Sequence, residues 1–314
     1  MLVTDFSRLT HSQLALPFTA FFISGPVFWP YFAGAAVLAI GLPIILKNEV
    51  PQARGLDKLM PFGRLFFAIP LAVFAGEHFT VARFMVSMVP SWIPAHLFWI
   101  YFVGVALVVA ALSIVVKKYA QLAAILLGIM MCLFVVLLHI PRVVANPRDR
   151  FSWAIALREL SFGGGAFAFA STQSKTPRPA NIAPPLLKLA RYLIAITALF
   201  FGVEHFLHPD HAPAVPLEKL TPTWIPLHLL WSYLMGAVLV AAGALLLVNK
   251  KTRAAATYLG LTVLLIILVI YLPIEISIPA DIGNGLNYIA DTMMFCGAVL
   301  LLADALPKEA PANA

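Results

Sequence analysis

The chain has 314 residues, of which 61% are hydrophobic and only 11% are charged. Soluble domains carry roughly 25% charged residues, so this composition excludes a soluble globular protein, a disordered chain and a disulfide scaffold. The formal net charge is +7. In so apolar a chain, the basic residues indicate which loops face the cytoplasm. We therefore do not attribute the positive charge to nucleic-acid binding, and we expect no nucleic-acid partner. The composition predicts an all-α fold: a polytopic transmembrane helical bundle whose partner is the lipid bilayer.

Apolar segments long enough to cross a bilayer, which takes about 20 residues, follow one another along the whole chain. A shorter apolar stretch at 14–24 precedes the first of them. We expect it to form a separate interfacial helix, because Pro17 and Gly25-Pro26 interrupt the pattern. The nine predicted spans are 26–46, 64–83, 94–116, 119–140, 151–171, 187–207, 224–248, 254–272 and 285–304.

The two halves of the chain repeat each other. Pro90-Ser91-Trp92-Ile93-Pro94 recurs as Pro222-Thr223-Trp224-Ile225-Pro226, 132 positions later, and Glu159 aligns with Asp291 at the same spacing. Matches at one constant spacing indicate an internal duplication. Four spans per copy return the chain to the same side, so we expect parallel copies, lying side by side as two helical quartets. The predicted domains are an extra N-terminal segment (1–61), a first repeat (62–171), a proline-rich linker (172–186), a second repeat (187–306) and a tail (307–314).

The second copy carries an insertion in its first loop. Gly-Glu-His-Phe at 76–79 recurs as Gly-Val-Glu-His-Phe at 202–206, so Glu77 and Glu204 are only 127 positions apart. Five additional residues must therefore follow Glu204 before the common spacing of 132 is restored.

Basic residues are distributed unevenly between the two sides of the predicted bundle. Fourteen of the 21 lysines and arginines fall on the side where the first span ends, and all eight histidines fall on the opposite side. Cytoplasmic loops are enriched in lysine and arginine, so we expect the N-terminus outside and the C-terminus in the cytoplasm.

Ionisable residues inside spans are costly in a bilayer and usually mark a site or an internal pair. Arg158 has no counterpart in the second copy, where Ala290 takes its place. Arg158 could therefore pair within its own copy, perhaps with Glu77, while Asp291 would rely on His205, His228 or water, or be protonated. This asymmetry favours the second copy as the site. The candidate catalytic residues are Glu204, His205, His228, Asp291, Glu77, His78, His96, Glu159 and Arg158.

Clusters of histidine and carboxylate permit several kinds of chemistry. They can relay protons or bind a metal. His205, His208 and His211 have the three-residue spacing of one helical face, although Pro209 argues against a continuous helix there. A zinc or copper site and a haem held by two histidines are the weaker alternatives, and ordinary solvated histidines remain open. We assign no metal ligand.

The motifs occur in a fixed order. Gly-x-Glu-His-Phe is followed by a loop ending in Pro-x-Trp-Ile-Pro, by Trp-x-Tyr-x-x-Gly and a basic turn, and by Arg158-Glu159 before Gly163-Gly164-Gly165. This arrangement resembles the DoxX-like family of four-helix membrane proteins. The resemblance covers 62–171 and 187–304. It implies a tandem DoxX-like protein with one extra helix, in a bacterial inner membrane and with a redox-associated role. The redox cysteines of some relatives have no counterpart here, so thiol chemistry is not implied.

The leading functional hypothesis is a redox-associated membrane protein, which binds quinone at the histidine–carboxylate cluster and belongs to a quinone-linked oxidoreductase. A quinone site needs hydrogen-bond donors, a proton relay and an aromatic-lined slot. Trp231 and Tyr233, with Trp99 and Tyr101 in the first copy, are the candidate aromatic residues. The chain encodes no electron carrier of its own, so a redox partner protein on the periplasmic side would supply electrons. The alternatives are a non-catalytic anchor or assembly subunit, and a proton-coupled transporter or small-molecule binder.

Overall fold

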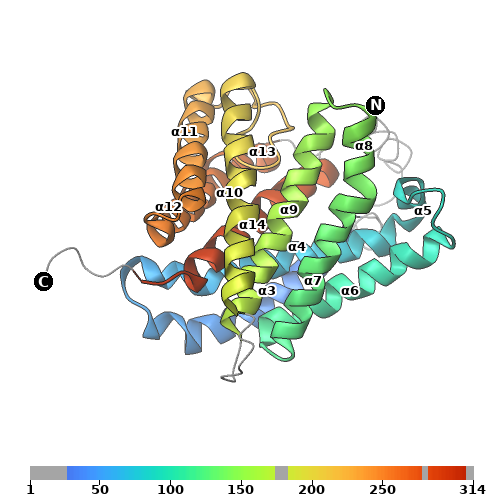
Figure 1. The fold of residues 1–314 in the computed structure, drawn as a ribbon, viewed down its shortest axis with the longest axis horizontal. Coiled ribbons are helices and arrows are strands. Elements are labelled where there is room, and N and C mark those ends of the chain that lie inside the picture. The colour runs from blue at the N-terminus through green and yellow to red at the C-terminus, as the bar shows by residue number, and fades with distance from the viewer. Residues whose placement is uncertain (1–26, 174–182, 278–281, 309–314) are drawn as a thin grey trace, which may run out of the picture.

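The computed structural model describes residues 27–173, 183–277 and 282–308, and the ordered elements in these residues are all helices (Figure 1). The predicted interfacial helix 14–24 lies outside the described residues, as do most of the linker and of the tail. The long helices are α3 (Phe28–Asn48), α4 (Met60–Thr80), α6 (His96–Val116), α7 (Ala120–Phe134), α9 (Arg150–Thr172), α10 (Ala183–Leu207), α11 (His228–Leu247), α12 (Thr252–Ile266) and α14 (Ile282–Ala305). The short ones are α5 (Ala82–Met85), α8 (Ile140–Ala145) and α13 (Leu272–Ser277).

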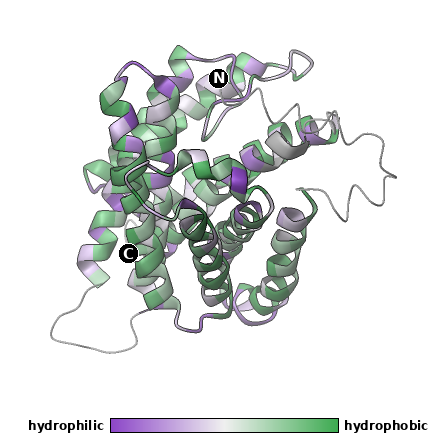
Figure 2. Ribbon diagram, turned by 90° about the vertical axis from the view of Figure 1, so that its right-hand side faces the viewer, coloured by the Kyte–Doolittle hydropathy of each residue, from purple (hydrophilic) through white to green (hydrophobic). Residues whose placement is uncertain are grey.

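Eight helical segments in the described part of the chain are long and apolar enough to cross a membrane, which confirms the predicted all-α polytopic bundle. Figure 2 shows hydrophobic residues predominating along these helices. The one remaining predicted span, 151–171, corresponds to α9, which has the length of a span but not the hydropathy. Arg158, Glu159 and its run of glycines lower that hydropathy. The polar content is tolerated because α9 packs among α7, α10 and α14.

Successive long helices alternate in direction, so the bundle has two ends. One end, which we call the basic end, contains the C-terminal ends of α3, α6, α9, α11 and α14. We call the opposite end the histidine end. In Figure 1, α7, α9 and α10 run steeply, whereas α4 and α6 are strongly inclined to them.

Local backbone structure repeats with the spacing seen in the sequence. Ala95 and Leu227, which precede α6 and α11, both adopt left-handed conformations, and they are 132 positions apart. The π-helical segments Val135–His139 and Ile267–Tyr271 are separated by the same number of residues. A π-helical turn is rare and often lies at a functional position. The duplicated sequence therefore builds duplicated local structure.

The two repeats are interleaved, which corrects the expectation of two quartets lying side by side. The first helix of each repeat packs against the last helix of the other: α4 on α14, and α10 on α9. Glycines permit this close approach. A Cβ on Gly165 would lie 2.5 Å from the Cβ of Ala298, and one on Gly297 would lie 2.5 Å from the backbone nitrogen of Phe67. Side chains of opposite repeats therefore meet in the middle of the bundle.

The loop that contains the insertion, 208–227, enters the bundle at the histidine end, and we call it the plug loop. Its residues 212–217 are all buried, with Ala212, Val215 and Leu217 completely so. Tyr271 donates to the carbonyl of Ala212 over 3.4 Å, and Thr292 donates to the carbonyl of Val215 over 2.8 Å. The corresponding loop of the first repeat, 81–95, is shorter and stays nearer the surface. The insertion thus changes the interior of the bundle.

Candidate functional site

Charged side chains of both repeats meet at the histidine end, where α4, α9 and α14 approach the plug loop. Because the repeats are interleaved, this site belongs to neither copy alone. We call it the polar cluster, and it consists of Glu77, His139, Arg150, Arg158, Glu159, Glu204, Glu218, Asn287 and Asp291.

The centre of the polar cluster is an ion pair that joins the two repeats. Arg158 Nη1 of α9 donates to Asp291 Oδ2 of α14 over 2.6 Å. The side chains are 17% and 7% exposed. This geometry overturns the expected pairing: Arg158 does not form its ion pair with Glu77, and Asp291 uses neither histidine. The reason is the packing of α9 on α14, which lets one arginine serve both copies and explains how the second copy can hold Ala290.

Glu159 forms the second pair of the cluster. His139 Nε2 lies 2.9 Å from Glu159 Oε2. His139 belongs to the π-helical segment after α7, which directs its ring towards α9. In the second repeat Tyr271 occupies the equivalent position and contacts the plug loop instead.

Glu204 pairs with an arginine that the sequence analysis did not select. Arg150 Nε, in the first turn of α9, donates to Glu204 Oε2 over 2.9 Å, and Arg150 Nη2 donates to the carbonyl of Leu217. His208 Nε2 lies 3.6 Å from the same carboxylate oxygen of Glu204. Arg150 thus ties α10 and the plug loop to the first repeat.

Glu77 lies on the α4 side of the cluster and is held by an amide. Asn287, with its nitrogen turned towards the carboxylate, donates to Glu77 Oε1 over 2.5 Å and approaches Oε2 to 3.2 Å. Among the described residues, no lysine or arginine forms an ion pair with Glu77. Arg158 lies within electrostatic range, although its hydrogen bond goes to Asp291.

Glu218, in the plug loop, is the functional candidate that sequence reasoning missed. Burial, together with the nearby Asp291 charge, raises the pKa of Glu218 to about 7, and the charges of Arg158 and Arg150 limit this rise. Its Oε1 is buried and has no hydrogen-bond partner in the described part of the chain, and the same holds for Arg158 Nε. The available signal was the apolar run 212–217 just before it, which is unusual for an exposed loop.

His205 has a structural position rather than a catalytic one. Its Nε2 accepts a hydrogen bond from the backbone N–H of Ala214 over 2.8 Å, so its Nδ1 carries the proton and donates to the carbonyl of Phe201. Both ring nitrogens are occupied, and the ring is completely buried. His78 similarly donates from Nδ1 to the carbonyl of Phe74 over 2.7 Å.

The remaining histidine candidates, His96 and His228, are the first residues of α6 and α11. Both side chains are partly exposed. Within the described residues, no three histidine, cysteine or carboxylate side chains are grouped so that they could hold a metal ion.

The predicted aromatic residues line the surface of the bundle. Trp99, Tyr101 and Tyr233 are each 41–42% exposed, and Trp231 is partly buried. Tyr101 stacks on Phe79, and Trp99 donates to the carbonyl of Pro94 over 3.1 Å. Such positions suit contact with lipid at the membrane interface.

Comparison with known proteins identifies one family model, which is described as a domain of unknown function (DUF8561) and matches residues 67–159. The match spans α4 to the middle of α9, within the first repeat. Neither the curated proteins nor the solved structures include a match.

Proposed function

We propose that this protein is a redox-associated membrane protein which exchanges protons with a lipid-soluble quinone at the polar cluster. The observation that carries the proposal is a surplus of carboxylate around Arg158. Asp291 is neutralised by this arginine, whereas Glu77 and Glu218 have no ion pair among the described residues. Buried carboxylates without a cation favour the protonated state.

The two orphaned atoms of the cluster support a polar ligand there. Arg158 Nε–H is a buried donor without an acceptor, and Glu218 Oε1 is a buried oxygen without a donor. Leaving such groups unpaired is costly, so both are suited to a ligand with carbonyl or hydroxyl oxygens. A quinone supplies two-electron chemistry that takes up or releases two protons. Arg158 would hold its oxygen, and Glu77 and Glu218 would each hold one proton.

The proposal changes the composition of the site suggested by the sequence. The leading residues are now Arg158, Glu77 and Glu218, in place of His205 and His228. Both ring nitrogens of His205 already form hydrogen bonds with backbone groups. Glu159 with His139, and Glu204 with Arg150, would keep the surrounding charges in place. The electrons would come from a redox partner protein at the histidine end.

We also propose the membrane orientation from the charge distribution. The excess of lysine and arginine at the basic end supports a cytoplasmic position for that end and a periplasmic position for the histidine end. The resemblance to the DoxX-like family supports a bacterial inner membrane.

The test is quinone binding by the purified chain in detergent, measured by calorimetry with a short-chain benzoquinone. Arg158→Lys keeps a cation opposite Asp291 but removes the Nε–H, and we expect about tenfold weaker binding, the value of one charge-assisted hydrogen bond. Glu218→Gln should abolish the pH dependence of binding near pH 7. Asp210→Asn, in the same loop but exposed, is the matched control.

A second candidate is a non-catalytic anchor, and the ion pair between the repeats specifically favours it. Arg158–Asp291 would then serve only to hold α9 against α14. In that case the wild-type chain binds no quinone, and the substitutions lower the melting temperature alone. That outcome would reject the quinone proposal and retain the anchor.

A further inference from the structure

A cleft opens at the basic end, far from the polar cluster along the helices. Its volume is about 310 Å³, and it lies between the segment joining α3 to α4 and the ends of α12 and α14. The lining is largely charged and comprises Glu49, Gln52, Ala53, Arg54, Asp57, Met60, Pro61, Arg253, Asp304 and Lys308.

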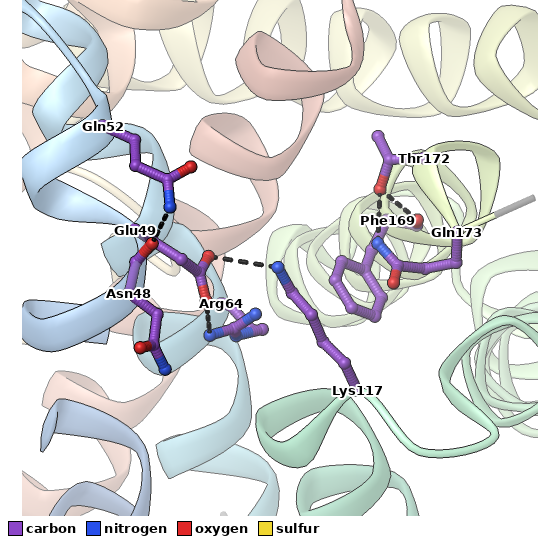
Figure 3. A network of polar contacts seen from close by, with 8 residues as sticks. All are labelled: Asn48, Glu49, Gln52, Arg64, Lys117, Phe169, Thr172 and Gln173. Carbon is purple, nitrogen blue, oxygen red and sulfur yellow. Dashed lines mark hydrogen bonds and ion pairs between the residues drawn. The ribbon is translucent and has the colours of Figure 1, made fainter. Parts of the chain in front are cut away.

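One carboxylate of the cleft, that of Glu49, forms ion pairs with two cations. Arg64 Nη2 lies 2.5 Å from Glu49 Oε1, and Lys117 Nζ lies 3.1 Å from Glu49 Oε2. Figure 3 shows Arg64 of α4 and Lys117 of the turn after α6 approaching Glu49. A single carboxylate cannot neutralise two cations, so this triad carries a net charge of +1.

A second carboxylate repeats the arrangement on another part of the lining. Arg253 Nη2 lies 2.8 Å from Asp57 Oδ1, and Lys308 Nζ lies 2.8 Å from Asp57 Oδ2. Arg253 also donates to the carbonyls of Ala303 and Leu306, at the end of α14. This triad, too, carries +1. The lining itself holds three cations and three carboxylates, so the surplus of two positive charges comes from Arg64 and Lys117, which lie outside the lining and pair with Glu49. The remaining charged lining residues, Arg54 and Asp304, offset each other.

Arg64, the buried partner of Glu49 behind the lining, has hydrogen-bond donors that remain unsatisfied. Only 2% of this residue is exposed, yet its Nε and Nη1 have no hydrogen-bond acceptor among the described residues. Buried guanidinium groups normally satisfy their donors, and an unpaired one is costly. A ligand that shared Glu49 or took its place would relieve this cost.

We propose that the cleft binds a phosphate group, either in a lipid headgroup or as free phosphate. Phosphate oxygens accept several charge-assisted hydrogen bonds at once, and arginine and lysine are the side chains that bind them. The end of the bundle where the cleft opens carries the excess of basic residues, the arrangement by which membrane proteins attract anionic lipid. The site is separate from the polar cluster and does not depend on the function proposed for it.

The test uses the full-length chain in lipid nanodiscs and a pair of matched double variants. Lys117→Gln with Lys308→Gln removes the surplus charge of both triads while each carboxylate keeps its arginine. Lys58→Gln with Lys118→Gln removes the same charge from exposed lysines of the same end. Retention of phosphatidylglycerol over phosphatidylcholine is measured by native mass spectrometry, and binding of inorganic phosphate by calorimetry.

We expect the first double variant to bind the phosphate probe at least about tenfold more weakly, from the contribution of a basic residue near an anionic surface. The Lys58 and Lys118 control should bind within about twofold of the wild type. Lys117→Arg with Lys308→Arg should retain binding, which separates lost charge from misfolding. Selective retention of phosphatidylglycerol identifies a lipid, and binding of inorganic phosphate identifies a free anion. Equal binding by the two glutamine double variants, or no binding of either probe, would overturn the proposal.

Discussion

Charge balance around a single arginine determines the chemistry of the polar cluster. Arg158 is bonded to Asp291 and also lies within electrostatic range of Glu77, Glu159 and Glu218. One cation cannot neutralise all these carboxylates, although His139 assists Glu159. Buried carboxylates without a cation partner favour the protonated form. Among the carboxylates of the cluster, Glu218 lies in a loop outside the spans, and burial raises its pKa to about 7.

Glu218 should make stability depend on pH. Its pKa rises from 4.5 to about 7 on folding, so the folded chain binds a proton that the unfolded chain lacks between these values. The contribution of Glu218 to the free energy of unfolding is therefore fully present below pH 4.5. It is lost as the pH rises towards 7, and the loss reaches about 3 kcal/mol. Glu218→Gln should remove this loss in thermal unfolding curves measured between pH 4.5 and 8. Parallel curves for the wild type and the variant would contradict the assignment.

At the scale of elements, the contacts of α9 set how the repeats are joined. Gly165 faces Ala298 of α14 and Phe67 of α4, whereas Gly163 faces α7 with more space. A Cβ on Gly163 would have its nearest neighbour at 3.3 Å, compared with 2.5 Å for Gly165. Two glycines of the same helix therefore contribute differently to packing.

This difference can be measured directly. Gly165→Ala should lower the free energy of unfolding by about 1–3 kcal/mol, the usual cost of overpacking. Gly163→Ala, the matched control two residues away, should change it much less, because the higher helix propensity of alanine offsets a small adjustment. Thermal unfolding in detergent compares the two. Equal destabilisation by the two substitutions would show that α9 packs no more tightly against α14 at Gly165 than against α7 at Gly163.

For the whole molecule, the interleaved packing means that neither repeat can be completed without the other. The first helix of each repeat depends on the last helix of its counterpart for its packing surface. The Arg158–Asp291 ion pair lies in the same interface. We therefore expect the two repeats to unfold as one cooperative unit.

A double-mutant cycle on this pair tests the coupling between the repeats. Asp291→Ala leaves a buried arginine without its partner and should cost about 3–5 kcal/mol. The double variant Arg158→Ala with Asp291→Ala removes both members of the pair, and its loss should be smaller than the sum of the two single losses. Additive losses in the free energy of unfolding would indicate that the pair does not couple the halves.

Hydropathy and local periodicity suffice to predict the helices, since apolar length and turn residues act within about 20 positions. Local sequence patterns were therefore enough to predict the all-α bundle, the recurring motifs and the separation of basic residues from histidines. The carboxylate that Arg158 binds became visible only in the folded chain, because its partner Asp291 is 133 positions away and belongs to the other repeat. Folding also brought Glu218 into the interior. Contacts of that range depend on how helices interleave, and close packing at glycines such as Gly165 and Gly297 leaves no local signature of the partner.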